Sequence, residues 1–428
     1  MKNYKFTVVF VLLLILEFNC AKDDIGIVPQ ARDYQYLVFP LSDDLFNNGL
    51  PASNLDEQLE NAINTLIKRI GASGTSTRKL GFMVGFPGFD TVRYATFQPF
   101  IEAAVRAAIK TDAAIYFYVP SKSGWENRPD LWNYNDPGAD GYNSDNSKNV
   151  EWSDWSGTAY PHEYRNWGTP EELPPCMCYN CPAIKSAFST LFNRKIMHIL
   201  SKAFKQLTDN NKIHLFAGVG VGDEQMLNNY EYVDTVDPVM GQFMTSRGAT
   251  KVRIGFNALT QKGFSQANPP QDFAKALADV NQEFVAYLCK LLNDGGIPAD
   301  KIYTHIAAGA GYEGTSFLKF SDAPLRVAFN NYSRPGFTTY ITGNPDDLSL
   351  IYASLEMHGI IHWGATEANP YCISRIDPET YLNLHFNHGA SLMVLNTGAT
   401  DPTFANKLYD GVYGADAIKA YYRFLSNK

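Results

Sequence analysis

The chain has 428 residues, of which 45% are hydrophobic and 19% are charged, a balance that excludes intrinsic disorder. Its 36 basic and 44 acidic side chains give a net charge of −8, and the absence of a dense lysine or arginine run argues against nucleic-acid binding. The composition also argues against a coiled coil and against a protein that crosses a membrane several times.

The first 19 residues have the layout of a secretory leader, with a basic start and an apolar run at 6–16 that is too short to span a bilayer. Cys20 follows, as in bacterial lipoproteins, where a lipidated cysteine becomes the new N-terminus. Residues 21–24 resemble the acidic export tag of Bacteroidetes surface lipoproteins. We therefore predict a signal peptide at 1–19, lipidation of Cys20, a tether at 20–33 and a lipid-anchored location in the cell envelope, on the outer-membrane surface or in the periplasm. An ordinary cleaved leader is the alternative.

After the leader, short apolar runs alternate with amphipathic segments. Continuous apolar runs indicate strands buried on both faces, and their alternation with helices indicates a parallel sheet. This predicts an α/β fold, a (β/α)8 TIM barrel, as a single domain at 34–428 with a long aromatic-rich loop insertion at about 121–182. A doubly wound sheet is the competitor, but no Gly-x-Gly-x-x-Gly turn follows the first strand. Predicted strands are 36–40, 81–86, 114–119, 213–221, 252–256, 302–307, 325–330, 360–363 and 391–395, and predicted helices are 55–70, 97–110, 183–208, 272–293, 348–358 and 415–425.

The predicted insertion concentrates the aromatic side chains. Five of the six tryptophans lie between Trp125 and Trp167, among charged and amide side chains and many turn formers. Indole faces beside polar groups suit pyranose rings, which offer C–H faces for stacking and hydroxyl groups for hydrogen bonds. The alternative is a packed accessory subdomain whose tryptophans form a small core. The candidate substrate-binding residues here are Trp125, Arg128, Asp130, Trp132, Asn133, Trp152 and Trp155.

Five cysteines remain beyond Cys20, and three of them form a Cys-x-Cys-x-x-Cys cluster at Cys176, Cys178 and Cys181. A metal site, one local disulfide with a spare thiol, and three buried free thiols all remain open for this cluster. Cys289 lies in an apolar helical pattern and is interpreted as a core residue.

Two glutamates follow apolar runs where a barrel would place catalytic groups, at the carboxyl ends of strands. Glu224 follows the 213–221 run, and Glu367 follows the 360–363 run. Counting from the first strand, with the 252–256 run treated as part of a loop, puts Glu224 after strand 4 and Glu367 after strand 7.

Gly222-Asp223-Glu224 and Trp363-Gly-Ala-Thr-Glu367 resemble motifs of the large clan of retaining (β/α)8 glycoside hydrolases, and segments 128–133 and 149–155 add the character of substrate loops. The resemblance implies a glycosidase that acts on an oligo- or polysaccharide, with Glu224 as acid/base and Glu367 as nucleophile. One departure is Asp223, because the clan usually has Asn before its acid/base residue.

The proposed chemistry requires one protonated carboxyl group to release the leaving group and one ionised carboxylate to attack the anomeric carbon. Tyr332 and Arg334 are candidates to hold the nucleophile ionised, and Trp363 is a candidate floor for the sugar. We expect no cofactor and no metal at the site. A non-catalytic glycan-binding lipoprotein with a barrel fold is the alternative function, and a barrel esterase or deacetylase is a third.

Overall fold

The computed structural model describes residues 34–41, 54–307, 316–340, 345–371, 374–398 and 401–427. All of them belong to one compact unit, Ala31–Lys428. The predicted signal peptide, Cys20 and the tether lie outside the described residues. Within the described ranges, no helix combines the length and the apolar character needed to cross a bilayer.

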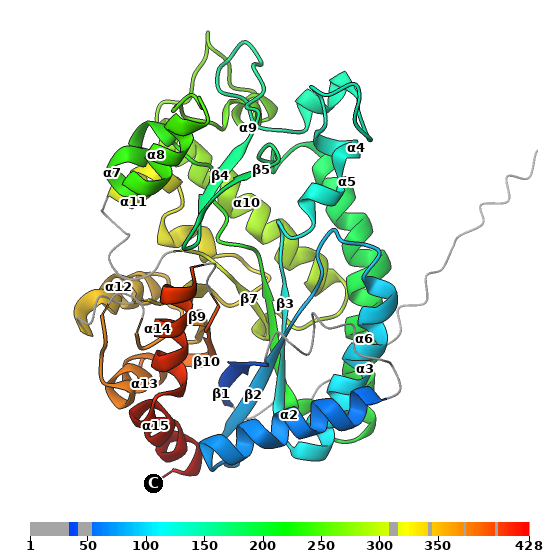
Figure 1. Cartoon of the computed structure of the whole chain (residues 1–428), viewed down its shortest axis with the longest axis vertical. Helices are drawn as coiled ribbons and strands as arrows, with labels where there is room; N and C mark the ends of the chain where they lie inside the picture. Colours follow the sequence, from blue (N-terminus) through cyan, green and yellow to red (C-terminus); the bar gives the residue numbers. More distant parts are fainter. Residues whose placement is uncertain are drawn as a thin grey trace, which may run out of the picture. The chain divides into compact units, whose positions relative to one another are not determined.

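Eight parallel strands of the described chain form a closed barrel surrounded by helices, which confirms the predicted fold (Figure 1). The sheet runs in the order β7-β6-β3-β2-β1-β10-β9-β8. Its two edges meet where Tyr303 pairs with Arg334 and Ile306 pairs with Phe337. The barrel strands are β1 (Gln35–Pro40), β2 (Arg78–Gly85), β3 (Ala114–Val119), β6 (Phe216–Val221), β7 (Ile302–Thr304), β8 (Gly336–Thr338), β9 (Trp363–Ala368) and β10 (Ala390–Leu395). Strand order around the barrel follows chain order, so β6 is the fourth strand and β9 the seventh.

Side chains fill the interior of the barrel, as expected for a packed core rather than a pore. Tyr36, Tyr116 and Tyr303 form this core together with small and branched residues of β1, β3, β6 and β10. The large rings require space opposite them. A side-chain carbon at Gly220 would lie 1.8 Å from the hydroxyl oxygen of Tyr116, so glycine is needed there.

Amphipathic helices cover the outside of the barrel. In α2, the buried residues Leu59, Ile63, Leu66 and Ile70 recur every three or four positions. The predicted helix at 183–208 is interrupted by a π-helical turn at Phe192–Ile196. The longer helices are α2 (Leu55–Ile70), α3 (Tyr94–Thr111), α5 (Pro182–Leu191), α6 (Met197–Asp209), α10 (Phe273–Asp294), α12 (Ser349–Met357), α13 (Pro378–Phe386), α14 (Pro402–Tyr413) and α15 (Ala415–Ser426).

The predicted strand at 325–330 is wrong, and the one at 360–363 is misplaced. Residues 325–330 contain a 3₁₀ helix, Leu325–Ala328, in which Val327 N–H bonds the carbonyl oxygen of Pro324, so the sixth strand is β8 instead. The run at 252–256 lies outside the barrel, which agrees with its treatment as part of a loop in the strand count, and its last residue begins α9 (Phe256–Gln261). The seventh strand begins at Trp363, which places Glu367 inside β9 rather than beyond it.

The 121–182 region holds a short helix, α4 (Pro129–Trp132), and an antiparallel hairpin of β4 (Glu163–Asn166) and β5 (Pro170–Leu173). The nearby cysteines Cys176, Cys178 and Cys181 are buried free thiols, which was one of the three alternatives left open by the sequence. Cys181 Sγ lies 3.3 Å from Oδ1 of Asn149. Cys289 is a buried core residue of α10, as predicted.

Candidate active site

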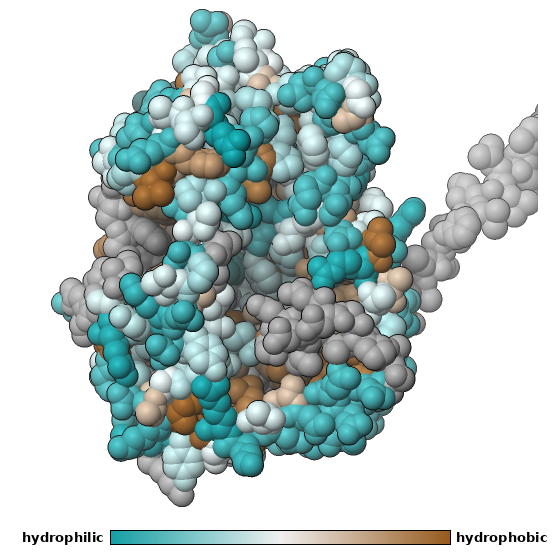
Figure 2. All heavy atoms as spheres, viewed as in Figure 1, coloured by the Kyte–Doolittle hydropathy of each residue, from teal (hydrophilic) through white to brown (hydrophobic). Residues whose placement is uncertain are grey.

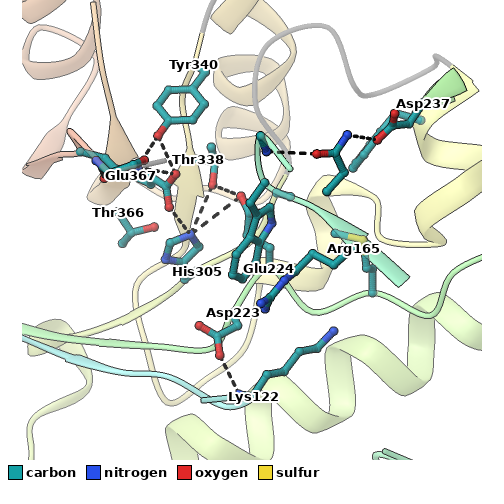
Figure 3. A pocket seen from close by; sticks show the side chains of 18 of the residues that line it. Lys122, Arg165, Asp223, Glu224, Asp237, His305, Thr338, Tyr340, Thr366 and Glu367 are labelled. Carbon is teal, nitrogen blue, oxygen red and sulfur yellow. Dashed lines mark hydrogen bonds and ion pairs between the residues drawn. The ribbon is translucent and has the colours of Figure 1, made fainter. Parts of the chain in front are cut away.

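A cavity of about 650 Å³ opens at the carboxyl ends of the barrel strands (Figure 3). Its floor comes from residues at or just beyond five successive strands, β6 to β10. Its upper wall comes from the β4–β5 hairpin and from the helices α7 (Val233–Val236), α8 (Pro238–Ser246) and α11 (Ser316–Ser321). The polar side chains of the floor are Asp223, Glu224, His305, Thr338, Tyr340, Thr366, Glu367 and Asn396.

Glu224 occupies a strained turn directly after β6. Its φ of 50° lies in the left-handed region, which costs a side chain other than glycine about 1 kcal/mol. The turn is held because Glu224 N–H donates to the carbonyl oxygen of His305 at 3.2 Å. Strain of this kind gathers at functional sites, and here it directs a carboxyl group into the cavity.

Asp223, the departure from the clan motif, is fixed by the protein on both carboxylate oxygens. The hydroxyl group of Tyr118 donates to Oδ1, and the backbone N–H of Lys122 donates to Oδ2 at 2.6 Å. Asp223 thereby ties the end of β6 to the end of β3 and supports the turn that carries Glu224.

The two glutamates meet across the cavity. One oxygen of Glu224, one oxygen of Glu367 and a ring nitrogen of His305 all lie within 4.8 Å of one another. Carboxyl groups about 5–5.5 Å apart permit nucleophilic attack, whereas about 6.5–9.5 Å leaves room for a water molecule and inversion. An oxygen–oxygen approach within 4.8 Å is compatible with the shorter class.

Hydrogen bonds around Glu367 favour its ionised form. Tyr340 Oη donates to Oε1 at 2.6 Å, and Asn396 Nδ2 donates to the same oxygen at 3.0 Å. His305 Nε2 lies 3.4 Å from Oε2. Burial acts to raise the pKa of Glu367, but His305, Tyr340 and Asn396 outweigh it, and the pKa is lowered.

Glu224 is shifted the opposite way. Burial, and then the charge of Glu367, raise its pKa to about 7. His305, whose Nε2 lies 3.9 Å from Oε1, and a hydrogen bond from the hydroxyl group of Thr338 offset part of this rise. One carboxyl group of the pair therefore holds a proton near neutral pH while the other is ionised.

His305 lies between the two carboxyl groups at the end of β7. Burial lowers its pKa, but the bond to Glu367 and the charges of Glu367 and Glu224 outweigh burial, so the pKa is raised. A protonated imidazole ring here stabilises the charge of Glu367.

The aromatic and polar residues predicted to bind substrate in the insertion do not line this cavity. The indole N–H groups of Trp125, Trp132 and Trp152 donate to the backbone carbonyl oxygens of Pro175, Trp125 and Ser147. Trp155 packs edge-on against Phe256 and Phe273; Asn133 is buried and donates to the carbonyl oxygens of Asp136 and Asp140; and Arg128 pairs with Asp130. These contacts fit the alternative of a packed subdomain.

Tyr332, Arg334 and Trp363 lie toward the opposite end of the barrel. Arg334 N–H bonds the carbonyl oxygen of Ile302, the first residue of β7, and Trp363 is the buried first residue of β9. From there, Tyr332 and Arg334 do not reach Glu367. Tyr340 and Asn396 make the hydrogen bonds to Glu367 that were predicted for Tyr332 and Arg334.

Four cavity residues were not predicted from the sequence: Thr338, Tyr340, Asn396 and Trp167. Asn396 could have been found by its place, because it directly follows β10, which was predicted; Thr338 and Tyr340 could not, because β8 was not predicted. Trp167 lies at the turn of the β4–β5 hairpin, is 43% exposed and lines the cavity.

Glu224, His305 and Glu367 are also a set of side chains, among the described residues, that could hold a metal ion. Two carboxylates and one imidazole suit a divalent cation such as Zn²⁺. Oε1 of Glu367 already accepts hydrogen bonds from the phenol of Tyr340 and the amide of Asn396. The opposite pKa shifts of the two glutamates fit a proton-transfer site as well as they fit a metal site.

No protein-family model matches the chain, and no curated protein matches it. Among solved structures, it is similar to the catalytic domain of a beta-amylase from Paenibacillus polymyxa, with 10% identity over 91% of this chain and 99% of that chain and a TM-score of 0.44. It is also similar to a glycoside hydrolase family 5 enzyme from Prevotella bryantii B14, with 12% identity over 91% and 97% of the two chains and a TM-score of 0.39. Likeness at this level carries no functional information, so function is inferred from the site itself.

Proposed function

We propose that this protein is a glycoside hydrolase that cleaves glycosidic bonds with retention of configuration. Glu224 is the acid/base, and Glu367 is the nucleophile. The observation that carries the proposal is that one oxygen of Glu224 and one oxygen of Glu367 lie within 4.8 Å of each other in one cavity, with the pKa of Glu224 raised to about 7 and that of Glu367 lowered. With these opposite pKa shifts, Glu224 can donate a proton and Glu367 can act as an anion at the same glycosidic bond.

In the first step, Glu367 attacks the anomeric carbon while Glu224 gives its proton to the departing oxygen. The glycosyl–enzyme ester is then hydrolysed by water, from which Glu224 takes a proton. His305, Tyr340 and Asn396 stabilise Glu367 before attack and again when it departs. The substrate is an oligosaccharide, a polysaccharide or another glycoside.

The test is hydrolysis of a panel of aryl glycosides by the wild type and by Glu224→Gln and Glu367→Gln, with Glu356→Gln on the exposed face of α12 as the matched control. Each active-site change is expected to lower kcat at least about 10³-fold, while the control keeps full activity. Proton NMR of the first-formed product is expected to show the anomer of the substrate.

Full activity in both active-site variants would overturn the assignment, and an inverted product would overturn retention alone. Glycan binding by a wild type that hydrolyses nothing would favour the non-catalytic binding lipoprotein instead.

The leader carries a separate proposal, namely that Cys20 is lipidated and anchors the protein to the cell envelope. Incorporation of labelled palmitate into the wild type, and its loss in Cys20→Ser, would support this. Equal labelling of both proteins would contradict it.

A further inference from the structure

The two sides of the cavity around the catalytic pair have different linings. Beside Glu367 lie the polar Tyr340 and Asn396, which contact its carboxylate, and Val394 and Leu395, which precede Asn396 at the end of β10. Beyond Glu224 lies a wall built from the β4–β5 hairpin, α7, α8 and α11, here called the Glu224 wall. It presents Trp167, Met226, Val236, Met240, Phe317 and Phe320 to the cavity.

The Glu224 wall is continuous with the turn that carries Glu224. Two residues after Glu224, Met226 already lines the wall. Asn229 N–H then donates to the carbonyl oxygen of Phe320 at 2.7 Å and fastens this segment to α11. Asn166 Nδ2 donates to Oδ2 of Asp237 at 2.8 Å and fastens the hairpin to the start of α8 (Figure 3).

Several polar groups of the Glu224 wall are paired with one another, although the buried Oδ1 of the neighbouring Asn228, which also lines the cavity, has no hydrogen-bond partner among the described residues. Asp237 uses Oδ2 for Asn166 and Oδ1 for the backbone N–H of Met240. Arg165 pairs with Glu171 at 2.8 Å and lies over the ring of Trp167, 3.8 Å from its centroid. A sugar in this half would bury hydroxyl groups with few open partners, which costs free energy.

Part of the surface on the same side of the molecule is apolar. Figure 2 shows hydrophobic side chains gathered over α7 and α8. On α8, Val239 is 61% exposed. The apolar character of the wall therefore continues outward from the cavity, where a long substituent would emerge.

The position of Glu224 determines which part of a substrate would contact the Glu224 wall. In a retaining reaction, the acid protonates the leaving oxygen, and the nucleophile attacks the anomeric carbon from the opposite face. The leaving group therefore lies on the acid's side of the pair. We propose that the Glu224 wall is a leaving-group subsite for an apolar aglycone, an alkyl or aryl group, with the Trp167 indole ring at its outer edge; this rests on the proposed function.

The test compares n-hexyl with methyl glycosides of one sugar, because the two alcohols are leaving groups of similar basicity. Each buried methylene contributes about fourfold. The wild type is therefore expected to show a kcat/KM for the hexyl glycoside at least about tenfold above that for the methyl glycoside. Val236→Asn and Trp167→Ala are each expected to reduce this ratio below about threefold. Ile361→Asn, exposed and not among the residues lining the cavity, is the control and should retain the wild-type ratio.

A wild-type ratio near one, or a ratio unchanged in both variants, overturns the subsite. Calorimetry separates this failure from failure of the proposed function. If the wild type hydrolyses none of these glycosides, the function fails. The proposal of an apolar site is still supported if the hexyl glycoside binds with a negative heat-capacity change that Val236→Asn removes. It is contradicted if the hexyl and methyl glycosides bind with the same affinity and heat-capacity change.

Discussion

The hydroxyl group of Tyr340 donates a 2.6 Å hydrogen bond to Oε1 of Glu367. Tyr340 follows β8 and Glu367 belongs to β9, so two neighbouring strands bring the donor and the carboxylate together. Asn396, beyond β10, donates both to Tyr340 Oη at 2.6 Å and to the same carboxylate oxygen. Neutral donors from two flanking strands therefore help to keep Glu367 ionised in a buried place.

The first prediction is a bell-shaped dependence of kcat/KM on pH. Activity needs Glu367 ionised and Glu224 protonated. The acidic limb should fall below pH 4.5, because the pKa of Glu367 is lowered from 4.5, and the basic limb should fall near pH 7. Rates of the preferred aryl glycoside between pH 3 and 9 measure both limbs. Constant activity from pH 6 to 9 would contradict the role of Glu224 as acid.

Tyr340→Phe removes a donor to the ionised nucleophile. A hydrogen bond to a charged group contributes about 1.5–3 kcal/mol, so kcat/KM should fall about 10- to 100-fold. The pKa of Glu367 should rise, and the acidic limb should move to higher pH while the basic limb moves less. Tyr352→Phe, in which the lost hydroxyl group bonds a backbone carbonyl oxygen on α13, is the matched control. An unshifted acidic limb would count against a role for Tyr340 in holding the charge.

Thr338→Val should shift the basic limb of the pH profile of kcat/KM. The Thr338 hydroxyl group donates to Oε1 of Glu224 and lowers its pKa, so its loss should raise that pKa further. The basic limb should then move above pH 7, and the ratio of the rate at pH 8 to that at pH 6 should increase. Thr338→Ser keeps the hydroxyl group and should restore the wild-type profile. A basic limb that moves downward would refute this role.

The sequence predicted the barrel and the meeting of Glu224 and Glu367 at its mouth for one physical reason. Strands buried on both faces are continuous apolar runs, so β6 is visible in the sequence, and the residues after it point to the mouth of the barrel. The same counting placed Glu367 with the seventh strand, although the strand itself runs on through Glu367.

Two residues that contact the pair, Thr338 and Tyr340, were missed because β8 has only three residues and begins with Gly336. A side-chain carbon there would lie 2.0 Å from the carbonyl oxygen of Thr304, so packing excludes the apolar residue that would mark a strand. With β8 hidden, the residues at its end, Thr338 and Tyr340, carried no signal. Arg334, before the strand, was chosen in their place.

The prediction that the tryptophans of the insertion bind substrate was wrong for a different reason. Composition shows that aromatic rings are present but not which way they face. Trp125 and Trp152 use their N–H groups to hold loop carbonyl oxygens, whereas Trp167 lies at a hairpin turn beside Gly168, whose φ is 109°. Only the turn distinguishes the exposed ring from the packed ones.

Metal dependence provides a further prediction. Proton transfer between Glu224, Glu367 and substrate needs no cation, so treatment with EDTA followed by its removal should leave kcat/KM unchanged. Added Zn²⁺ should inhibit competitively, because Glu224, His305 and Glu367 offer three ligand atoms within 4.8 Å. Inhibition should weaken as pH falls and protons compete for these atoms. Loss of activity with EDTA and its recovery with Zn²⁺ would show that this cluster works as a metal site.

Glu151 is a second carboxyl group with a raised pKa, and it lies outside the cavity. It is buried in the 121–182 region, where Oε2 accepts a hydrogen bond from the N–H of Ala258 at 3.3 Å. Burial raises its pKa from 4.5 to about 8, so the folded protein keeps this group protonated at neutral pH. A buried neutral carboxyl group can be replaced by an amide of nearly the same shape.

The last prediction is that Glu151→Gln changes the pH dependence of stability but not activity. Between about pH 4.5 and 8, the folded wild type holds a proton that the unfolded chain releases, so its free energy of unfolding falls as pH rises. Relative to the variant, this loss should be about 1.4 kcal/mol per pH unit and should level off above pH 8. Urea unfolding of both proteins at pH 5, 6, 7 and 8 measures the difference, with Glu126→Gln, at an exposed position in the same region, as the control. A constant difference across this range would mean that Glu151 is ionised in the fold, and the hydrogen bond from Ala258 would then have to stabilise a buried charge.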